Sequence, residues 1–282
     1  MVRRVPVVSL IVVLAVLVSF SIPLFYLVLV SFVSPESYYG GLFRVTLSNT
    51  RVVITPVFVR SVLVSFVTAS AGSILSLAVT ISAAYGFFVY YTYGSYALPR
   101  PARFLLGFFL FLLVFNGGIV PLYMVARHLV LIDTYCALFI PYLLNFLIVL
   151  YCLEQFRKVP ASLLEAGRLE GLREPGILIR IMLPIKLRLL GSLLIVHFAL
   201  HWNNWYPGVL FINSPAKRPV QVFLRDLLFA DQSFQHLGMS RMTIAPPERM
   251  SFILFSLVPI MIAFACLLGI NRRRGLRGRQ HE

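Results

Sequence analysis

The sequence predicts an all-α integral membrane protein with six transmembrane helices, and three observations lead to this prediction. Hydrophobic residues make up 59 % of the chain and charged residues only 12 %, whereas soluble domains carry about 25 % charged residues. Six uncharged stretches reach the roughly 20 residues that a helix needs to cross a bilayer. The basic residues between these stretches are unevenly divided between the two sides of the membrane, as in other helical membrane proteins.

The six stretches are bounded by the charged residues of the chain. They are Val5–Pro35, Ser61–Pro99, Phe104–Ala126, Thr134–Leu153, Leu189–Ala216 and Met250–Asn271. From them we expect spans at roughly 7–33, 61–92, 104–126, 134–153, 187–212 and 250–270, all in one transmembrane domain that covers residues 1–282. The first stretch follows Arg3 and Arg4 and is about twice as long as a signal-peptide h-region, so we expect it to remain as a span.

Two connections between the predicted spans stand out. The inner segment Glu154–Arg188 holds seven basic and four acidic residues, which makes it the most charged part of the chain. The segment Asn213–Arg249 contains four prolines and is expected to form a long outer loop.

The net charge of +15 is explained by topology. With the N-terminus inside and six spans, 16 of the 25 basic residues fall on the inner side and nine on the outer side. This bias predicts that both termini are cytoplasmic. The basic cluster Arg272–Arg279 is then expected to anchor the last span at anionic lipid, and a nucleic-acid partner is not indicated.

No catalytic or metal-binding pattern is present in the sequence. Cys136, Cys152 and Cys266 lie in apolar stretches without CxxC spacing, so neither a disulfide nor a metal site is expected. His197 and His201 lack the glutamate of a zinc-binding HExxH motif. The P-loop pattern GxxxxGK[ST] is missing as well, so an ATP-driven process would need its ATPase on another chain.

The inner segment Glu154–Arg188 contains a pattern with fixed spacing. It begins with Glu165-Ala166-Gly167, continues after three residues with Gly171, and ends after nine more with Ile181-Met182-Leu183-Pro184. This pattern resembles the EAA loop of binding-protein-dependent ABC importers, in which Glu-Ala-Ala, three residues, Gly, nine residues and Ile-x-Leu-Pro follow one another. Every spacing matches, and the one departure is Gly167 where the family usually has Ala.

Other stretches resemble a sugar-permease branch close to lipoprotein-associated oligosaccharide importers. Phe115–Tyr123 is similar to its FxGGxIPxY stretch, and Leu131–Leu138 is similar to the loop and span that follow. Trp202–Tyr206 and Pro219–Arg225 are similar to its WNxW and PLQxxLR features. The resemblance runs from about Ser61 to Leu228, whereas the tail Gly269–Glu282 lacks the ending that is usual in the family.

The resemblance implies a type I ABC importer permease fold in a prokaryotic plasma membrane. It implies a second homologous permease subunit, two ATP-binding cassette ATPases that bind ATP and magnesium, and an extracytoplasmic solute-binding (lipo)protein that delivers a sugar or oligosaccharide. This chain would bind no cofactor and would not be an enzyme. The segment 154–186 would act as the coupling loop, and the residues implied to couple to the ATPase are Glu165, Ala166, Gly167, Arg168, Gly171, Ile181, Leu183 and Pro184.

The chemistry of this loop is consistent with force transmission through a short helix on the inner face. Leu163, Leu164, Ala166 and Leu169 would form an apolar stripe. Gly171 would end the helix or allow another backbone to approach closely, and Pro184 would interrupt the beginning of the fifth span. Glu165 has two interpretations: it contacts the ATPase, or it completes a capping box with Ser162.

The fifth stretch carries polar residues on one face of a helix. His197, His201, Asn204 and Gly208 are spaced at i, i+4, i+7 and i+11. Polar groups inside a bilayer usually face the bundle interior or a water-filled path, where Asn and His can bind sugar hydroxyls and Trp can stack on a sugar ring. The alternative is hydrogen bonding between helices with an aromatic belt at the membrane surface. Candidate pathway residues are Asn116, Asn145, His197, His201, Trp202, Asn204 and Trp205.

Two other functions are kept as alternatives. An ion- or proton-coupled secondary transporter is expected to carry an acidic residue within a span, and none of the six stretches has one. A structural or assembly subunit without a pathway is the other alternative.

Overall fold

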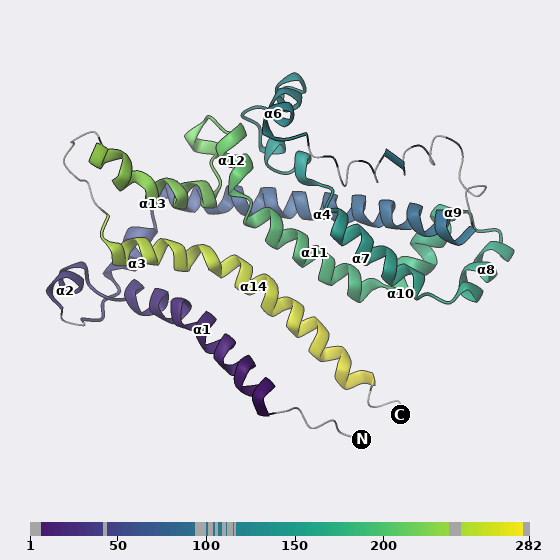
Figure 1. Ribbon diagram of the computed structural model, residues 1–282, viewed down its shortest axis with the longest axis horizontal. Helices are drawn as coiled ribbons and strands as arrows, with labels where there is room; N and C mark the ends of the chain where they lie inside the picture. Colours follow the sequence, from purple (N-terminus) through teal and green to yellow (C-terminus); the bar gives the residue numbers. More distant parts are fainter. Residues whose placement is uncertain are drawn as a thin grey trace. The chain divides into compact units, whose positions relative to one another are not determined.

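The computed structural model describes residues 7–41, 44–93, 117–236 and 244–278, together with residues 100, 104, 107–108, 111 and 115. The described part is almost entirely helical, apart from an isolated antiparallel bridge between Val33 and Val45 (Figure 1). The chain divides into two compact units. Unit 1 comprises Met1–Val62 and Val222–Pro259, and unit 2 comprises Leu63–Gln221 and Ile260–Glu282.

Unit 1 is built from the ends of the chain. It contains α1 (Val7–Ser31), α2 (Pro35–Gly40), α3 (Ser48–Val53), the first turns of α4 (Pro56–Tyr93), most of α13 (Val220–His236) and the first part of α14 (Pro246–Gly278). Most of the described side chains of α1 are exposed, whereas Phe58, Phe223 and Phe252 form an aromatic cluster with ring centroids 5.0–5.6 Å apart.

Buried polar side chains close the end of α1. The buried Asn49 donates from Nδ2 to the carbonyl oxygens of Ser31 at 3.0 Å and Val33 at 2.8 Å. Ser251 of α14 donates from Oγ to the same Ser31 carbonyl at 2.9 Å. The last carbonyls of a helix have no partner inside it, so these bonds satisfy groups that would otherwise be buried without one.

The segment Asn213–Arg249 is not the long loop that its prolines predicted. It contains the 17-residue helix α13, which begins directly after Pro219. Apolar residues at 220, 223, 224, 227 and 228 have the spacing of a helix face. Proline is well tolerated at a helix start, and this is why the proline count misled the prediction.

Unit 2 holds the remaining elements. They are the rest of α4, α6 (Ile119–His128), the 3₁₀ turns η1 (Tyr135–Leu138) and η2 (Ile140–Tyr142), α7 (Phe146–Arg157), α8 (Ala161–Leu169), α9 (Glu174–Ile177), the π-helical turn η3 (Leu178–Met182), α10 (Leu183–Ile185), α11 (Leu187–Trp202), α12 (Trp205–Phe211) and η4 (Pro215–Lys217). Figure 1 shows α11 alongside α4, with α7 to α10 near the end of α4.

The main hydrophobic core of unit 2 joins the membrane helices to the charged inner segment. Buried residues of α4, from Ala84 to Val89, pack with Val149, Cys152, Leu153 and Phe156 of α7. The same cluster includes Leu164 of α8, Ile177 of α9, Met182 of η3 and Leu193 of α11. Burying a side chain such as Leu164 stabilises the fold by about 1.5–3 kcal/mol, so the short helices α8 and α9 are held by packing.

The described residues contain helices that could cross a membrane, but they do not establish that the chain has six spans. Three helices among them are long and apolar enough to cross a bilayer, at Leu10–Ser31, Pro56–Thr92 and Pro246–Ala265. The pair Tyr135–Tyr142 and Phe146–Arg157 passes the same test together but bends by 55°, and Leu187–Trp202 is shorter. Eight residues of the predicted third span, 104–126, lie outside the described residues, and α6 forms the last part of that span.

Two of the predicted spans are broken. The fourth starts as the two 3₁₀ turns and becomes α-helical only at Phe146, where Asn145 accepts a hydrogen bond from the Ile148 N–H at 3.4 Å and caps α7. The fifth is interrupted at Asn203 and Asn204, which separate α11 from α12. Breaks of this kind occur at membrane depth only where protein or a cavity surrounds them.

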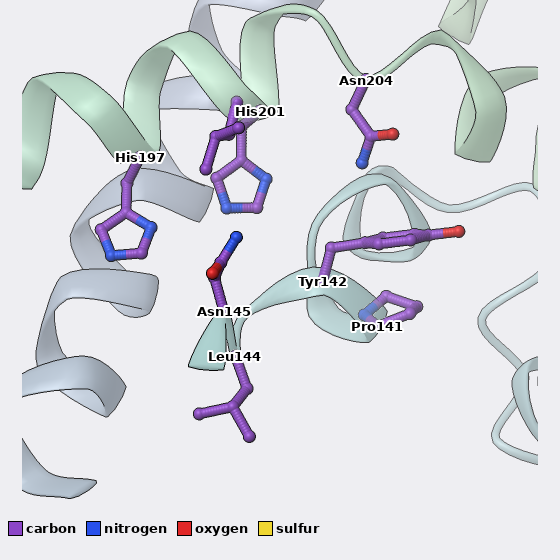
Figure 2. Close-up of a pocket in the computed structure, with 8 residues that line it drawn as sticks. Pro141, Tyr142, Leu144, Asn145, His197, His201 and Asn204 are labelled. Carbon is purple, nitrogen blue, oxygen red and sulfur yellow. The ribbon is translucent and has the colours of Figure 1, made fainter. Parts of the chain in front are cut away.

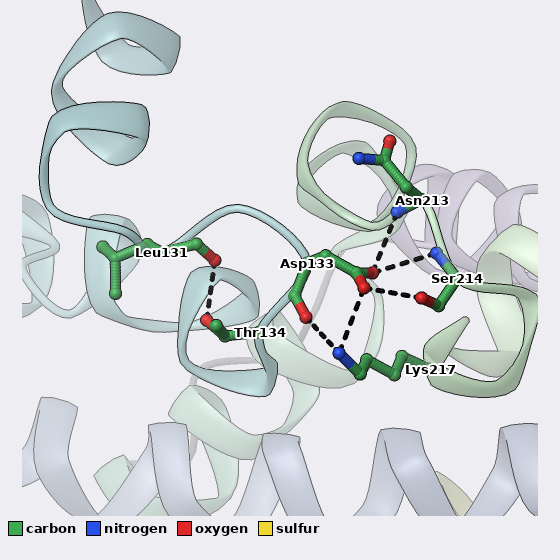
Figure 3. A network of polar contacts seen from close by, with 6 residues as sticks. All are labelled: Leu131, Asp133, Thr134, Asn213, Ser214 and Lys217. Carbon is green, nitrogen blue, oxygen red and sulfur yellow. Dashed lines mark hydrogen bonds and ion pairs between the residues drawn. The ribbon is translucent and has the colours of Figure 1, made fainter.

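A polar network centred on Asp133 joins the loops at the far ends of these two spans (Figure 3). Asp133 has a positive φ of 58°. Its carboxylate accepts hydrogen bonds from the N–H groups of Asn213 and Ser214 at 3.1 and 2.9 Å, and from the Ser214 hydroxyl at 2.5 Å. Lys217 Nζ donates to the same carboxylate at 3.1 Å and to the Asp133 carbonyl at 2.5 Å.

These bonds favour the charged carboxylate. The Ser214 hydroxyl, the Ser214 N–H and Lys217, in that order, hold the pKa of Asp133 well below its usual value. A lowered pKa in the folded protein means that the carboxylate stabilises the fold above its unfolded pKa of about 3.9. This contribution is lost as the pH falls through the folded value.

We therefore predict that Asp133→Asn lowers the melting temperature of the detergent-solubilised protein by a few degrees at pH 7. Asn also adopts positive φ, so the change tests the carboxylate and not the backbone. The difference from wild type should shrink when melting is measured at pH 3. Glu154→Gln, which breaks the exposed pair with Arg157, is the control and should melt like wild type. An equal difference at both pH values would contradict this assignment.

Candidate functional site

The breaks in the fourth and fifth predicted spans face one another across a pocket of about 260 Å³. Figure 2 shows the side chains that line it from both segments. Pro141, Tyr142, Leu144 and Asn145 come from η2 and the turn before α7, and His197, Leu200, His201 and Asn204 come from α11 and the break after it. The pocket lies entirely within unit 2.

The two histidines are held against α4. His201 Nε2 lies 2.8 Å from Ser76 Oγ, and His197 Nε2 lies 3.1 Å from Thr80 Oγ1. One turn before Ser76, a Cβ at Gly72 would lie 2.8 Å from Phe139 Cβ and 3.0 Å from the His201 ring. Gly72, Ser76 and Thr80 therefore form a small-residue stripe that lets α11 approach α4 closely, as at other helix contacts in membranes.

Polar side chains from both broken segments line the pocket. His201 Nδ1 and Tyr142 Oη are buried and have no hydrogen-bond partner among the described residues. The amide groups of Asn145 and Asn204 also line the pocket (Figure 2). Imidazole, phenol and amide groups can each bind a hydroxyl, so a ligand rich in hydroxyls would match this lining.

Four of the seven candidate pathway residues meet in this pocket. Asn145, His197, His201 and Asn204 line it together, and the histidines also make the interhelical bonds that were the alternative interpretation. Trp202 is fully buried, stacks on Phe198 and does not line the pocket. Trp205 is exposed and contacts Tyr206 edge-on. Asn116 lies outside the described residues.

The inner segment forms the helix α8 with one buried and one exposed face. Leu164 and Gly167 are buried and Arg168 is half-buried, whereas Leu163, Glu165, Ala166 and Leu169 are exposed. The predicted apolar stripe was therefore wrong, since Leu164 alone of its members is buried and Leu169 is 90 % exposed. The orientation of α8 on the core decides which leucine is buried, and hydropathy alone does not predict this orientation.

The capping interpretation of Glu165 is also wrong. The N-cap of α8 is Pro160, and the helix has no side-chain cap. Ser162 already lies inside the first turn, so the pair Ser162 and Glu165 cannot form a capping box, which needs the serine at the N-cap. Glu165 is left exposed on the surface of α8.

Each glycine of the pattern has its own structural role. A Cβ on Gly167 would lie 2.5 Å from Cδ1 of Ile181, so the side chain of Ile181 occupies the space that Ala would need. Gly171 has a φ of 84° and no neighbour near its Cβ position. The Gly171 N–H donates to Arg168 O and the Leu172 N–H donates to Gly167 O, which is the Schellman pattern that ends a helix. Gly171 is thus required for its conformation, and not for a close contact.

The end of the pattern lies in irregular helix. Ile181 belongs to the π-helical turn η3, and Leu183 and Pro184 belong to the short α10. Proline removes one helical N–H and crowds the carbonyl four residues earlier, and a π turn directly before it relieves that crowding. Such turns often mark functional sites in helices.

Sequence reasoning missed two residues at this end of unit 2. Glu174 accepts a hydrogen bond from Tyr85 of α4 at 2.6 Å and an ion pair from Arg168 of α8 at 2.8 Å. The contact between Tyr85 and Glu174 has no local signal, since Tyr85 lies 89 residues before Glu174 in the chain. The small-residue stripe at 72, 76 and 80 was also missed, although its four-residue spacing could have been found.

The fold matches a solved ABC transporter structure. It aligns with a chain of a bacterial ABC transporter involved in the import of the acidic polysaccharide alginate, with a TM-score of 0.73 and 21 % sequence identity. The alignment covers 95 % of this chain and 98 % of that chain. The chain therefore has the fold of an ABC importer permease.

The chain is similar to two curated proteins of one organism, whereas no family model matches it. It is 28 % identical over 215 residues to the polygalacturonan/rhamnogalacturonan transport system permease protein YtcP of Bacillus subtilis (strain 168), with 74 % of this chain and 72 % of YtcP covered. It is 28 % identical over 216 residues to protein LplC of the same organism, with 76 % of this chain and 71 % of LplC covered.

The chain is thus a membrane-spanning permease subunit of the ABC importer class, as the EAA pattern predicted. Permeases of this class are not ATPases, so ATP hydrolysis belongs to a separate subunit. The secondary-transporter and assembly-subunit alternatives have no comparable support.

Proposed function

We propose that this chain forms half of the translocation pathway of a binding-protein-dependent carbohydrate importer and couples to its ATPase through α8. The observation that carries the proposal is the shared core of unit 2. Leu164 of α8 packs in the same cluster as α4 and α11, the helices that hold the pocket histidines. A displacement of α8 would therefore act on the pocket through packed side chains.

The proposed architecture is a single transmembrane domain over residues 1–282 with six spans and both termini in the cytoplasm of a prokaryotic cell. The broken helices η1, η2 and α7 would make up the fourth span, and α11 with α12 the fifth. The positive-inside bias supports this orientation, which puts α8 on the cytoplasmic side and the Asp133 network on the outer side.

The proposed substrate is a sugar or oligosaccharide. YtcP is a permease for polygalacturonan or rhamnogalacturonan, and the solved transporter imports alginate. The pocket supports the same class, because its neutral amide, imidazole and phenol groups suit hydroxyls. Asn145, His197, His201 and Asn204 are the proposed contacts, with Asn116, Trp202 and Trp205 as further pathway candidates.

The proposed complex contains a second homologous permease, two ATPases that bind ATP and magnesium, and an extracytoplasmic binding protein. The ATPases would contact the exposed face of α8, where Glu165, Ala166 and Leu169 lie. The buried Gly167 and the partly buried Ile181 would hold α8 in place, and Leu183 and Pro184 would form the link to α11.

The pocket is tested by Asn204→Leu, which replaces an amide on the pocket wall with an apolar group. We expect severalfold lower uptake of radiolabelled trigalacturonate or alginate trisaccharide, whichever the wild-type complex imports, with unchanged assembly of the complex on a gel-filtration column. Asn203→Leu is the matched control, because Asn203 is exposed and does not line the pocket. Equal uptake by both variants would remove Asn204 from the pathway.

Coupling is tested at Gly171 and Glu165. Gly171→Leu forces a bulky residue into positive φ at a cost of about 1–2 kcal/mol, which should distort the end of α8 and lower the sugar imported per ATP hydrolysed. Gly171→Asn should retain most of the coupling, because Asn tolerates this conformation. Glu165→Lys should uncouple and Glu165→Gln should not. Wild-type coupling in both Gly171→Leu and Glu165→Lys would refute the proposed role of the loop.

A further inference from the structure

One carboxylate connects three elements at the cytoplasmic end proposed for unit 2. Glu174, the first residue of α9, accepts from the Tyr85 hydroxyl at 2.6 Å through Oε2. Through Oε1 it accepts from Arg168 Nε at 3.2 Å and Arg168 Nη2 at 2.8 Å. Hydrogen bonds of this kind, with a charged acceptor, are about twice as strong as neutral ones.

The two partners of Glu174 are set in different surroundings. Tyr85 is buried in the main core, where its ring lies against Phe88 and Phe156. The Arg168 side chain is 29 % exposed and that of Glu174 is 41 % exposed. An ion pair with this much solvent exposure contributes little stability by itself. The hydrogen bond from the buried Tyr85 is therefore the contact that fixes the position of Glu174.

The connection leads directly to the pocket. Tyr85 lies nine residues after Ser76 and five after Thr80 on α4, which is about 14 Å and 8 Å along a helix. Ser76 and Thr80 are the residues that hold His201 and His197. A continuous set of contacts therefore runs from α8 through Arg168, Glu174 and α4 to the pocket wall.

We propose that Glu174 is a positioning residue that makes α8 and α4 move as one body during transport. This rests on the proposed function, in which the ATPase pushes on α8. The covalent route from α8 to the pocket passes through the π turn and the interruption at Lys186 before it reaches α11. The Glu174 contacts bypass these irregular turns and deliver the displacement to the uninterrupted helix α4.

The experiment is a double-mutant cycle in the complete importer, reconstituted in proteoliposomes with its second permease, ATPase and binding protein. Tyr85→Phe removes only the hydroxyl, and Glu174→Gln removes the charge while keeping the shape. The readout is the amount of the imported trisaccharide per ATP hydrolysed, because a merely structural role would change the amount of complex and not this ratio. We expect each variant to lower the ratio by about threefold to tenfold, and the double variant to lower it no further than one of them.

Tyr91→Phe is the matched control, since it removes an exposed hydroxyl from the same helix, and it should keep the wild-type ratio. If Glu174→Gln fails to assemble, Tyr85→Phe alone decides, and an unchanged ratio in it overturns the proposal. Effects that multiply in the double variant would overturn it as well, because the two residues would then act separately. The Gly171→Leu variant separates the two levels: if it uncouples while Tyr85→Phe does not, only the Glu174 proposal fails.

Discussion

The structure of unit 2 depends on the burial of the charged inner segment in the core of the membrane helices. Helices as short as α8 and α9 are not stable alone in water, because so few hydrogen bonds cannot offset the cost of nucleation. Leu164, Ile177 and Met182 stabilise them by packing against α4 and α7. The same packing prevents α8 from moving independently of the membrane helices. The close-packed core and the contacts of Glu174 with Tyr85 and Arg168 together link the exposed surface of α8 to the distant pocket.

The second constraint is that broken helices need partners for their polar groups. Asn145 caps α7 directly at the pocket, and the Asp133 carboxylate accepts from two N–H groups in the loop after α12. With the ends of both broken segments fixed in this way, the gap between them persists as a cavity. His201 and Tyr142 line that cavity, and their Nδ1 and Oη atoms are buried without partners in the described part of the chain. Buried polar groups left in this state are costly.

Several features could be predicted from the sequence because their signals are local. Gaps between charges located α1, α4 and α14, although α4 begins five residues before its predicted limit and α14 ends eight residues after its own. The spacing of His197, His201 and Asn204 predicted one polar stripe, and the three residues do line one pocket. The spacing of the EAA pattern predicted the importer class, which the relatives support.

Other features depend on contacts between distant segments and leave no local pattern. Hydropathy is equally high in a continuous and a broken helix, so the breaks at Asn145 and Asn204 were not predicted. Glu174 sits among other charged residues and looks like a solvated side chain until Tyr85 is placed beside it. The helix α13 was not predicted because prolines flank it. Leu169 was assigned to the wrong face of α8 because it lies one residue after the half-buried Arg168, at the edge of the buried face.

In the proposed importer, α8 presents a cytoplasmic surface that receives the ATPase. The most direct measurement is labelling of Leu169→Cys and Ala216→Cys by a membrane-impermeant maleimide, in a chain whose three native cysteines are replaced by alanine. Both positions are exposed. In sealed cells we predict labelling at position 216 and none at 169, and in inside-out vesicles we predict labelling at 169 that decreases when the ATPase is bound. Labelling of position 169 from outside sealed cells would show that α8 does not lie on the cytoplasmic side.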